Sequence, residues 1–233
     1  RRGVKLTIDS DLPLASGLGS SSATAVASLA AASSALAHRL SKEKLVELSM
    51  VSERLTHRNP SGIDVNVSVY GGVLLFKKKE HPKMVNLEVP VDFAVGCSGV
   101  QRDTSVMIER FSQKRSGQPH LFDALVNSSS SLSEYAASAL KRDDLSTLGS
   151  ILNFYQGVLS WLGLSTPLLD RMVEQALRAG ALGAKLTGAG GGGCMIALPK
   201  RGFTEKIAET LRQVGVDAFT TRLPVGGVKV WKG

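Results

Sequence analysis

A glycine- and serine-rich segment near the start of the chain has residue types that can bind phosphate. Residues 13–23 read PLASGLGSSSA, and an alanine-rich stretch with helical character follows directly. Glycine lets the backbone come close to an anion, and the first turn of a helix offers unpaired N–H groups at the positive end of its dipole. Serine hydroxyls there can cap the helix, bind a phosphate oxygen or ligate a hard cation. Without a ligand, the same residues equally fit a glycine turn that leads into a serine-capped helix.

A second glycine run lies far downstream, at residues 188–193, where five of six residues are glycine. Glycine between strands costs backbone entropy, and a backbone that lies against a ligand is a common reason to tolerate it. A flexible hairpin tip is the alternative interpretation. Neither glycine segment is followed by Gly-Lys-Ser or Gly-Lys-Thr, so neither is a Walker A motif. Phosphate binding would therefore depend on backbone amides and hydroxyl groups.

Two carboxylates between these segments, Glu53 and Asp64, complete a set suited to phosphoryl transfer. That reaction needs charge neutralisation on the phosphates and an oriented attacking hydroxyl. One carboxylate can hold Mg²⁺ beside a serine hydroxyl, and the other can orient or deprotonate the acceptor. Taken singly, Glu53 also fits a surface helical glutamate, and Asp64 a turn residue or helix cap. His57 is a weaker candidate because it lies close to Asp64, although the histidines show no metal-ligand spacing.

The composition argues against several other classes of protein. The 233 residues are 43% hydrophobic and 21% charged, which fits a globular protein with a sizeable core in one or two domains. The net charge of +8 is scattered in short runs without interleaved aromatic residues, so a nucleic-acid partner is not indicated. No stretch is apolar enough for a membrane span. Cys97 and Cys194 have neither metal nor redox spacing and make no disulfide framework, which favours a reducing interior.

The hydrophobic pattern predicts strands and helices in alternation. Strands are expected at residues 4–8, 73–76, 93–97, 184–187, 194–198, 217–222 and 228–231, and a strand or connector at 85–90. Helices are expected at residues 21–40, 104–111, 120–140, 144–162, 167–179 and 204–214. A further helix is expected to begin after Ser41, which would cap it, and Gly180 is expected to stop the helix at 167–179. Residues 65–69 fit either a strand or a short helix. Hairpin-like neighbours favour an α+β fold with mixed sheets flanked by helices over a purely parallel sheet.

Three segments together resemble the motifs of the GHMP small-molecule kinases, most closely those of the branch that acts on mevalonate. They are residues 13–23, residues 59–64 with 69–72, and residues 185–194. The branch that acts on phosphomevalonate more often carries an aspartate late in the third motif. The resemblance spans nearly the whole chain. It implies two domains, residues 1–88 and 89–233, of which the first is incomplete and the second is ferredoxin-like.

The resemblance also implies roles for individual residues. Ser21 and Glu53 match the residues that hold Mg²⁺, and Asp64 matches the catalytic aspartate at the phosphoryl acceptor. The positions that would contact ATP are Pro13, Ala15, Ser16, Gly17, Leu18, Gly19, Ser20, Ser21 and Ser22. The acceptor would further meet Thr104 and the third motif at Gly188, Ala189 and Gly190.

Members of this family carry roughly a further domain's worth of chain before the first motif, including a lysine near the catalytic aspartate. The chain begins at Arg1, directly before an expected strand, so we expect the sheet which that strand joins to be incomplete. We therefore expect the 233-residue chain alone to be unstable or inactive. Robust mevalonate-dependent ATP turnover by this chain would contradict that expectation.

On this resemblance we expect ATP- and Mg²⁺-dependent phosphorylation of the 5-hydroxyl of mevalonate in the cytoplasm. The expected partner is the small-molecule substrate, without nucleic acid or membrane, and a homodimer stays open. One alternative is another kinase of the family, acting on phosphomevalonate, a sugar or an amino alcohol. Another is a non-catalytic ligand-binding homologue, against which the presence of both Glu53 and Asp64 argues.

Overall fold

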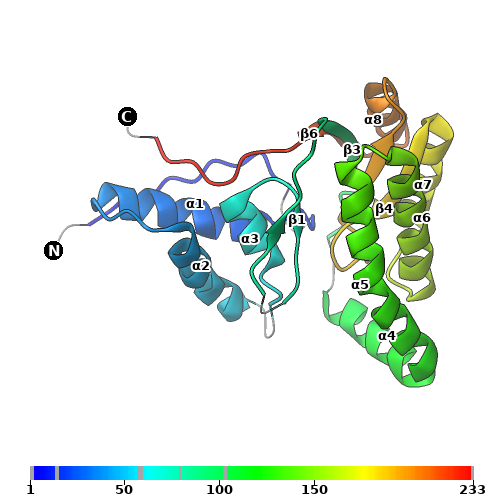
Figure 1. Ribbon diagram of the computed structural model, residues 1–233, viewed down its shortest axis with the longest axis horizontal. Helices are drawn as coiled ribbons and strands as arrows, with labels where there is room; N and C mark the ends of the chain where they lie inside the picture. Colours follow the sequence, from blue (N-terminus) through cyan, green and yellow to red (C-terminus); the bar gives the residue numbers. More distant parts are fainter. Residues whose placement is uncertain (1–2, 14–15, 57–59, 79, 102–103, 232–233) are drawn as a thin grey trace. The chain divides into compact units, whose positions relative to one another are not determined.

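The computed structural model describes residues 3–13, 16–56, 60–78, 80–101 and 104–231 (Figure 1). Contacts divide the chain into two compact units, and each is described by itself. The first unit consists of Arg1–Leu14, Gly19–Asn86 and Pro224–Gly233, and the second of Ala15–Leu18 and Leu87–Leu223. Residues 224–231 thus pack with the first unit, and residues 16–18 of the serine-rich segment pack with the second. The expected folding domains, 1–88 and 89–233, stay a prediction.

The described part of the first unit contains three helices and a small antiparallel sheet. The helices are α1 (Ser20–Ala35), α2 (Lys42–Thr56) and α3 (Ile63–Tyr70), and the strands are β1 (Leu74–Leu75) and β2 (Lys83–Met84). Its core joins Val26 and Ala30 of α1 to Leu45 of α2 and to Val65 and Val69 of α3. The spacing of these residues puts one apolar face of each helix into the same core.

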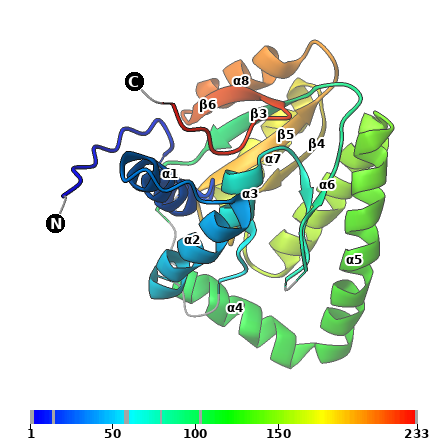
Figure 2. The same cartoon turned by 60° about the vertical axis from the view of Figure 1, so that its left-hand side comes forward.

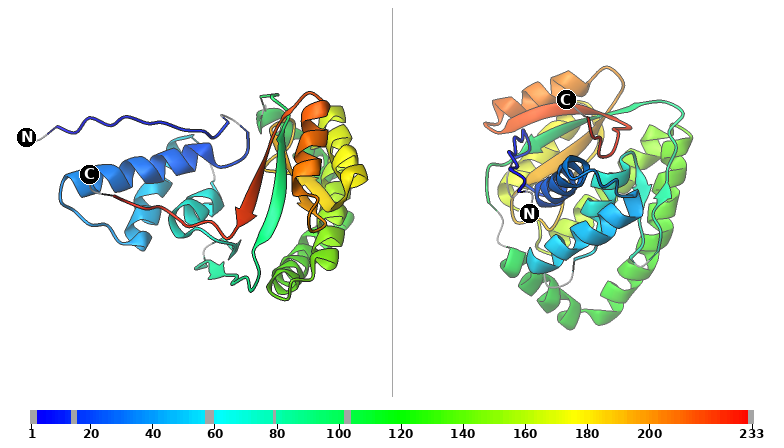
Figure 3. Two further views of the ribbon diagram at one scale, coloured as in Figure 1. Left: turned by 90° about the horizontal axis from the view of Figure 1, so that it is seen from above. Right: turned by 90° about the vertical axis from the view of Figure 1, so that its left-hand side faces the viewer.

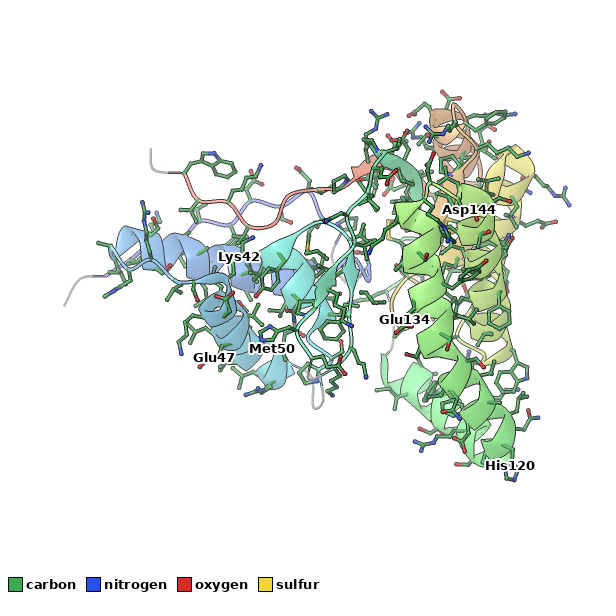
Figure 4. The ribbon with its side chains drawn as sticks, in the orientation of Figure 1. Lys42, Glu47, Met50, His120, Glu134 and Asp144 are labelled. Carbon is green, nitrogen blue, oxygen red and sulfur yellow. A yellow bond between two sulfur atoms is a disulfide. The ribbon has the colours of Figure 1, made fainter. Side chains whose placement is uncertain are left out.

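Two local features fix the second and third helices. The Ser41 hydroxyl accepts a hydrogen bond from the Lys44 amide at 3.2 Å, as expected for a cap of α2. Gly62 starts α3 at φ 86°, and a Cβ there would lie 3.1 Å from the Sδ of Met50, a residue of α2 labelled in Figure 4. The backbone conformation therefore favours glycine, and a larger residue would require the Met50 side chain to shift. Of the two interpretations of residues 65–69, the short helix is confirmed.

The second unit is built on a four-stranded antiparallel sheet in the order β4-β5-β3-β6. Its strands are β3 (Val91–Cys97), β4 (Ala181–Leu186), β5 (Cys194–Pro199) and β6 (Asp217–Leu223). Its helices are α4 (Thr104–Gly117), α5 (Pro119–Lys141), α6 (Leu145–Trp161), α7 (Pro167–Ala179) and α8 (Thr204–Gln213). Figure 2 shows α7 and α8 on one face of this sheet, and Figure 3 shows β3 beside β6. Both described sheets are antiparallel, and the expected α+β class is confirmed.

The core of the second unit lies between the sheet and its two covering helices. Fully buried Leu169 and Met172 of α7 and Ile207 and Leu211 of α8 pack there with Leu186 of β4. Each such large apolar side chain contributes about 1.5–3 kcal/mol when it leaves water. This core fixes β4 and β5, and through them the glycine run that joins the two strands.

Capping residues set the ends of the helices that neighbour β4. Asp144, labelled at the start of α6 in Figure 4, accepts a hydrogen bond from the Thr147 amide at 3.0 Å. Thr166 accepts one from the Leu169 amide at 3.2 Å, and Pro167 occupies the first turn of α7. Gly180 ends α7 in the left-handed region at φ 115°, as the sequence predicts.

Helix α6 lies very close to β4. A Cβ at Gly183 would come within 2.1 Å of the carbonyl oxygen of Gly149, and one at Gly149 within 2.7 Å of the Leu182 backbone. The side-chain amide of Asn153 makes two hydrogen bonds to the backbone of β4. Its Oδ1 accepts from the Ala184 N–H at 3.0 Å, and its Nδ2 donates to the Leu182 carbonyl at 3.1 Å. Two facing glycines thus allow side chains of a helix to bond directly to a strand.

Two expected strands are wrong. Residues 3–10 form no strand, and Val4, Leu6 and Ile8 are 42%, 46% and 60% exposed. Alternation can predict a strand, but a strand also needs a neighbour for its backbone hydrogen bonds. Residues 228–231 also form no strand, because this segment meets the end of α3 instead: the Val228 amide donates to the Ser68 carbonyl at 2.9 Å. Residues 85–90 are the connector rather than a strand.

The expectation that the two cysteines form no disulfide is wrong. Cys97 and Cys194 are joined by a disulfide although they lie 97 positions apart in the sequence. The register of β3 against β5 pairs these two residues directly, at the ends of adjacent antiparallel strands. Their spacing in the sequence carries no sign of this register.

Among the described helices, none has the length and apolar character of a bilayer-spanning segment.

Candidate active site

The first carboxylate of interest is buried against the start of α1. Glu53 is 9% exposed and Ser22 is 1% exposed, and the Ser22 hydroxyl donates a hydrogen bond to Oε1 of Glu53. Glu53 is therefore not the surface glutamate that its position beside Arg54 also allowed. A carboxylate and a hydroxyl are hard oxygen donors of the kind that Mg²⁺ prefers. Within the described ranges, no three His, Cys, Asp or Glu side chains gather into a metal-binding group.

The start of α1 differs in one detail from the expected site. Glu53 contacts Ser22, whereas Ser21 is exposed. The pairing of Ser21 with Glu53 at a metal stays a prediction. Gly19 precedes the helix at φ 73° with no side-chain cap, so the expected serine cap is not the arrangement seen. The amides of Ser20, Ser21 and Ser22 form the first turn and lie at the positive end of the helix dipole.

The second carboxylate lies beside the same turn. A Cβ added at Gly19 would lie 3.4 Å from the Cβ of Asp64 and 3.6 Å from its Oδ1. Asp64 is exposed in the first turn of α3, while its neighbours Val65 and Asn66 are buried. Asn66 donates from Nδ2 to the Gly62 carbonyl at 2.8 Å, which fixes the turn before Asp64. The first unit therefore brings Glu53 and Asp64 to the same end of α1.

The earlier part of the serine-rich segment packs with the second unit. The carbonyl of Ser16 accepts from the Cys194 amide at 3.0 Å, and Leu18 packs against Val95, Cys97 and Cys194. Gly17 has a positive φ of 85° that glycine adopts readily. This part of the first motif therefore contacts the end of the third motif directly. Pro13 is half-buried in the first unit, and Ala15 lies outside the described residues.

The glycine run at residues 188–193 is held in place rather than forming a free hairpin tip. The Gly191 amide donates to the Leu164 carbonyl at 2.8 Å, and the Gly193 amide donates to the Val100 carbonyl at 3.1 Å. Gly190 has φ 79°, and a Cβ there would lie 2.1 Å from the Leu164 carbonyl oxygen. Much of the glycine content is thus required by close packing within the unit. Gly188 is exposed and Ala189 is half-buried.

Two further candidate site residues, Thr104 and His57, are not described in full. Thr104 begins α4, but its side chain is not among those described, and His57 lies outside the described residues. Lys185, in the strand that enters the glycine run, received no role from the sequence. Its Nζ donates to the Leu186 carbonyl at 2.6 Å, and burial lowers the pKa of this amine. A single lysine in an otherwise apolar strand was the signal that could have drawn attention to it.

Family models match both halves of the chain. The model of the GHMP kinases N terminal domain matches residues 1–72, and that of the GHMP kinases C terminal matches residues 136–217. The first match contains the serine-rich segment and both carboxylates, and the second contains the glycine run.

Individual relatives agree with these matches. The mevalonate kinase of Pyrococcus abyssi is 35% identical over 99% of this chain and 69% of its own length. That of Aeropyrum pernix is 34% identical over 97% of this chain and 70% of its own length.

Solved structures have the same fold. The crystal structure of L. major mevalonate kinase in complex with R-mevalonate matches with a TM-score of 0.83 and 25% identity, over 91% of this chain and 68% of that one. A Streptococcus pneumoniae phosphomevalonate kinase matches with a TM-score of 0.76 at 19% identity, over 89% of this chain and 69% of that one, which shows the fold alone. From its motifs, its fold and these relatives, the chain belongs to the GHMP kinases, ATP-using enzymes that phosphorylate an alcohol.

Proposed function

We propose that this kinase transfers the γ-phosphoryl group of ATP to the 5-hydroxyl of mevalonate, giving 5-phosphomevalonate and ADP. The observation that carries the proposal is the grouping of Glu53 and Asp64 at the serine-rich start of α1. Its relatives at 34% and 35% identity are mevalonate kinases, which supports mevalonate as the acceptor. We place the reaction in the cytoplasm, with a small-molecule substrate as its partner.

In this proposal the first turn of α1 binds the phosphates of ATP. The amides and hydroxyls of Ser20, Ser21 and Ser22 supply donors there, and the helix dipole favours an anion. Gly19 has no side chain, which lets a phosphate come close to the backbone. The remaining contacts with ATP come from Pro13, Ala15, Ser16, Gly17 and Leu18.

Glu53 would hold Mg²⁺ together with a serine hydroxyl of the same turn. Oxygen donors of this kind fit a hard cation that keeps phosphate oxygens and water as its other ligands. When bound, the ion would neutralise charge on the phosphates. Glu53 is buried and hydrogen-bonded, so its carboxylate is fixed before any ligand binds.

Asp64 would act on the acceptor. An exposed carboxylate beside Gly19 can accept the proton of an acceptor hydroxyl or orient that hydroxyl for in-line attack on the γ-phosphorus. Thr104 and the third motif at Gly188, Ala189 and Gly190 would bind the rest of the acceptor. The third motif suits this role because hydrogen bonds to Leu164 and Val100 hold its backbone in one conformation.

A panel of acceptors tests the proposal. ADP release is measured with mevalonate, phosphomevalonate, homoserine and a hexose, both for the 233-residue chain and for the product of the whole reading frame that encodes it. We expect mevalonate to give the highest kcat/KM by at least about a hundredfold, because an acceptor pocket discriminates strongly through its polar groups. Turnover of another acceptor at a higher kcat/KM by the product of the whole reading frame, or turnover of no acceptor by that product, would reject mevalonate as the substrate.

The roles proposed for Ser21 and Ser22 can be distinguished by substitution. We expect Ser22→Ala to lower kcat/KM for MgATP by about tenfold to a hundredfold, because it removes the hydroxyl that holds Glu53. Ser21→Ala is the comparison variant one residue away, with an exposed hydroxyl in the structure. If Ser21 supplies the metal ligand instead, its variant alone will raise the Mg²⁺ concentration needed for half-maximal rate. The measurement is a Mg²⁺ titration of the rate for both variants.

A further inference from the structure

A buried glutamine on α6 makes hydrogen bonds on two opposite sides. Gln156 is 8% exposed, and its Oε1 accepts from the Leu186 amide at 2.9 Å. Its Nε2 lies 3.2 Å from Oδ1 of Asp170 and 3.3 Å from the hydroxyls of Ser160 and Ser165. A backbone N–H requires an acceptor and a carboxylate requires a donor, so the orientation of the amide is fixed.

The Oε1 atom of Gln156 bonds to the strand that directly precedes the glycine run. Leu186 is the last residue of β4, and the next residue, Thr187, donates from both its amide and its hydroxyl to the Cys194 carbonyl, at 2.9 Å and 3.1 Å. These bonds close the base of the loop formed by residues 188–193. The Oε1 of Gln156 therefore holds the strand at the point where the loop departs.

The Nε2 atom of Gln156 bonds to the segment that contacts the middle of the same loop. Ser165 donates to Oδ1 of Asp170 at 2.6 Å, and Ser160 donates to that atom at 3.1 Å, which ties the connection between α6 and α7 to α7. Leu164 lies in this connection, and its carbonyl accepts from Gly191 at 2.8 Å. At Gly190, a Cβ would lie 2.1 Å from that carbonyl oxygen.

We propose that Gln156 is a positioning residue for the loop of residues 188–193, because a single side chain fixes the base of the loop through Leu186 and its middle through the segment beside Leu164. The inference rests on the proposed function, in which this loop binds the acceptor. Gln156 itself touches no reacting atom. Its effect is to keep the loop backbone in the conformation that binds the acceptor.

The expected consequence is a defect specific to the acceptor. A misplacement of about 1 Å at a reacting centre can cost about a hundredfold in rate. Loss of the Gln156 hydrogen bonds should therefore lower kcat/KM for mevalonate by about tenfold to a hundredfold. The KM for ATP should stay within about threefold of wild type, because phosphate binding in the proposal depends on the start of α1.

The first test moves the single negative charge of the network from position 170 to position 156. Gln156→Glu keeps an acceptor for Leu186 but places a second carboxylate against Asp170, where like charges repel. Adding Asp170→Asn restores a donor–acceptor pair in the reverse direction, and the Ser160 and Ser165 hydroxyls can donate to the new glutamate. We expect the single variant to show the acceptor defect, and the double variant to recover to within about threefold of wild type. If Gln156→Glu does not fold, Gln156→Met removes both sets of bonds without adding charge.

Asn153 provides a matched control. It lies on the same helix and also makes two hydrogen bonds to β4, but to Leu182 and Ala184, farther from the loop. Asn153→Ala should lower the melting temperature while leaving the KM and kcat for the acceptor unchanged. An equal acceptor defect in this variant would show that Gln156 acts only through the general stability of the sheet, which would overturn the inference.

A second measurement is independent of the reaction. Amide hydrogen exchange of residues 187–193 in the ligand-free product of the whole reading frame should be about tenfold faster in the Gln156 variant than in wild type, and unchanged in Asn153→Ala. Wild-type exchange in the Gln156 variant, or no recovery in a folded double variant, would overturn the inference. If the wild-type protein phosphorylates no acceptor, the proposed function fails, whereas the exchange rates still decide whether Gln156 positions the loop.

Discussion

Replacing Asp64 with asparagine is expected to lower kcat by about 10²–10⁴-fold, while the KM for ATP stays within about threefold of wild type. The substitution keeps the size of the side chain and removes the group that would accept or orient the acceptor proton. Asp64 is exposed beside Gly19, so the change should leave the packing of α3 intact. Steady-state rates with saturating ATP and mevalonate give kcat, and titration of ATP gives its KM.

Glu47→Gln is the matched control for Asp64→Asn. Glu47 is an exposed carboxylate of α2, labelled in Figure 4, and it pairs with Lys44 at 2.8 Å. Loss of such an exposed ion pair changes stability by at most about 1 kcal/mol and should not affect turnover. Near-normal turnover of Asp64→Asn would remove the catalytic role proposed for Asp64. An equal loss of turnover in both variants would show a general electrostatic effect rather than a specific one.

Replacing Gly183 with alanine is expected to lower the free energy of unfolding by about 3 kcal/mol, at the upper end of what overpacking costs. The added methyl group would lie 2.1 Å from the Gly149 carbonyl oxygen, which is backbone and cannot rotate away. Helix α6 would have to move off β4 and weaken the hydrogen bonds of Asn153. Urea denaturation should show a lower midpoint with an unchanged slope.

Gly157→Ala is the control for Gly183→Ala. Gly157 lies on α6, the helix whose Gly149 faces Gly183. It is exposed, and a Cβ there would meet nothing within 4 Å. Alanine is favoured over glycine inside a helix by about 1 kcal/mol, so this variant should be more stable than wild type. A destabilisation of equal size in both variants would mean that α6 as a whole, rather than the contact between Gly149 and Gly183, is sensitive to substitution.

Much of the local structure could be predicted because its causes lie close together in the sequence. Thr166, Pro167 and Gly180 bracket α7, and the helix occupies the expected residues. The strands around the glycine run were likewise recognisable from their apolar residues. The motifs identified the family for the same reason, since each is a short contiguous segment.

The parts that could not be predicted depend on partners far away in the chain. Cys97 and Cys194 meet only because β3 and β5 pair in one register. Val4, Leu6 and Ile8 alternate as a strand does, but alternation does not supply a hydrogen-bonding neighbour. Which of three adjacent serines contacts Glu53 depends on the rotation of α1 about its own axis, which the sequence does not state.

The close fit of α6 to β4 also bears on whether this edge of the sheet can pair with another polypeptide. β4 is one of the two edge strands of the described four-stranded sheet, and such an edge is a ready template for pairing with another polypeptide. Here the Leu182 carbonyl and the Ala184 and Leu186 amides already bond to Asn153 and Gln156. The two amide side chains take the place of a fifth strand, so this edge offers an incoming chain little to which it could add.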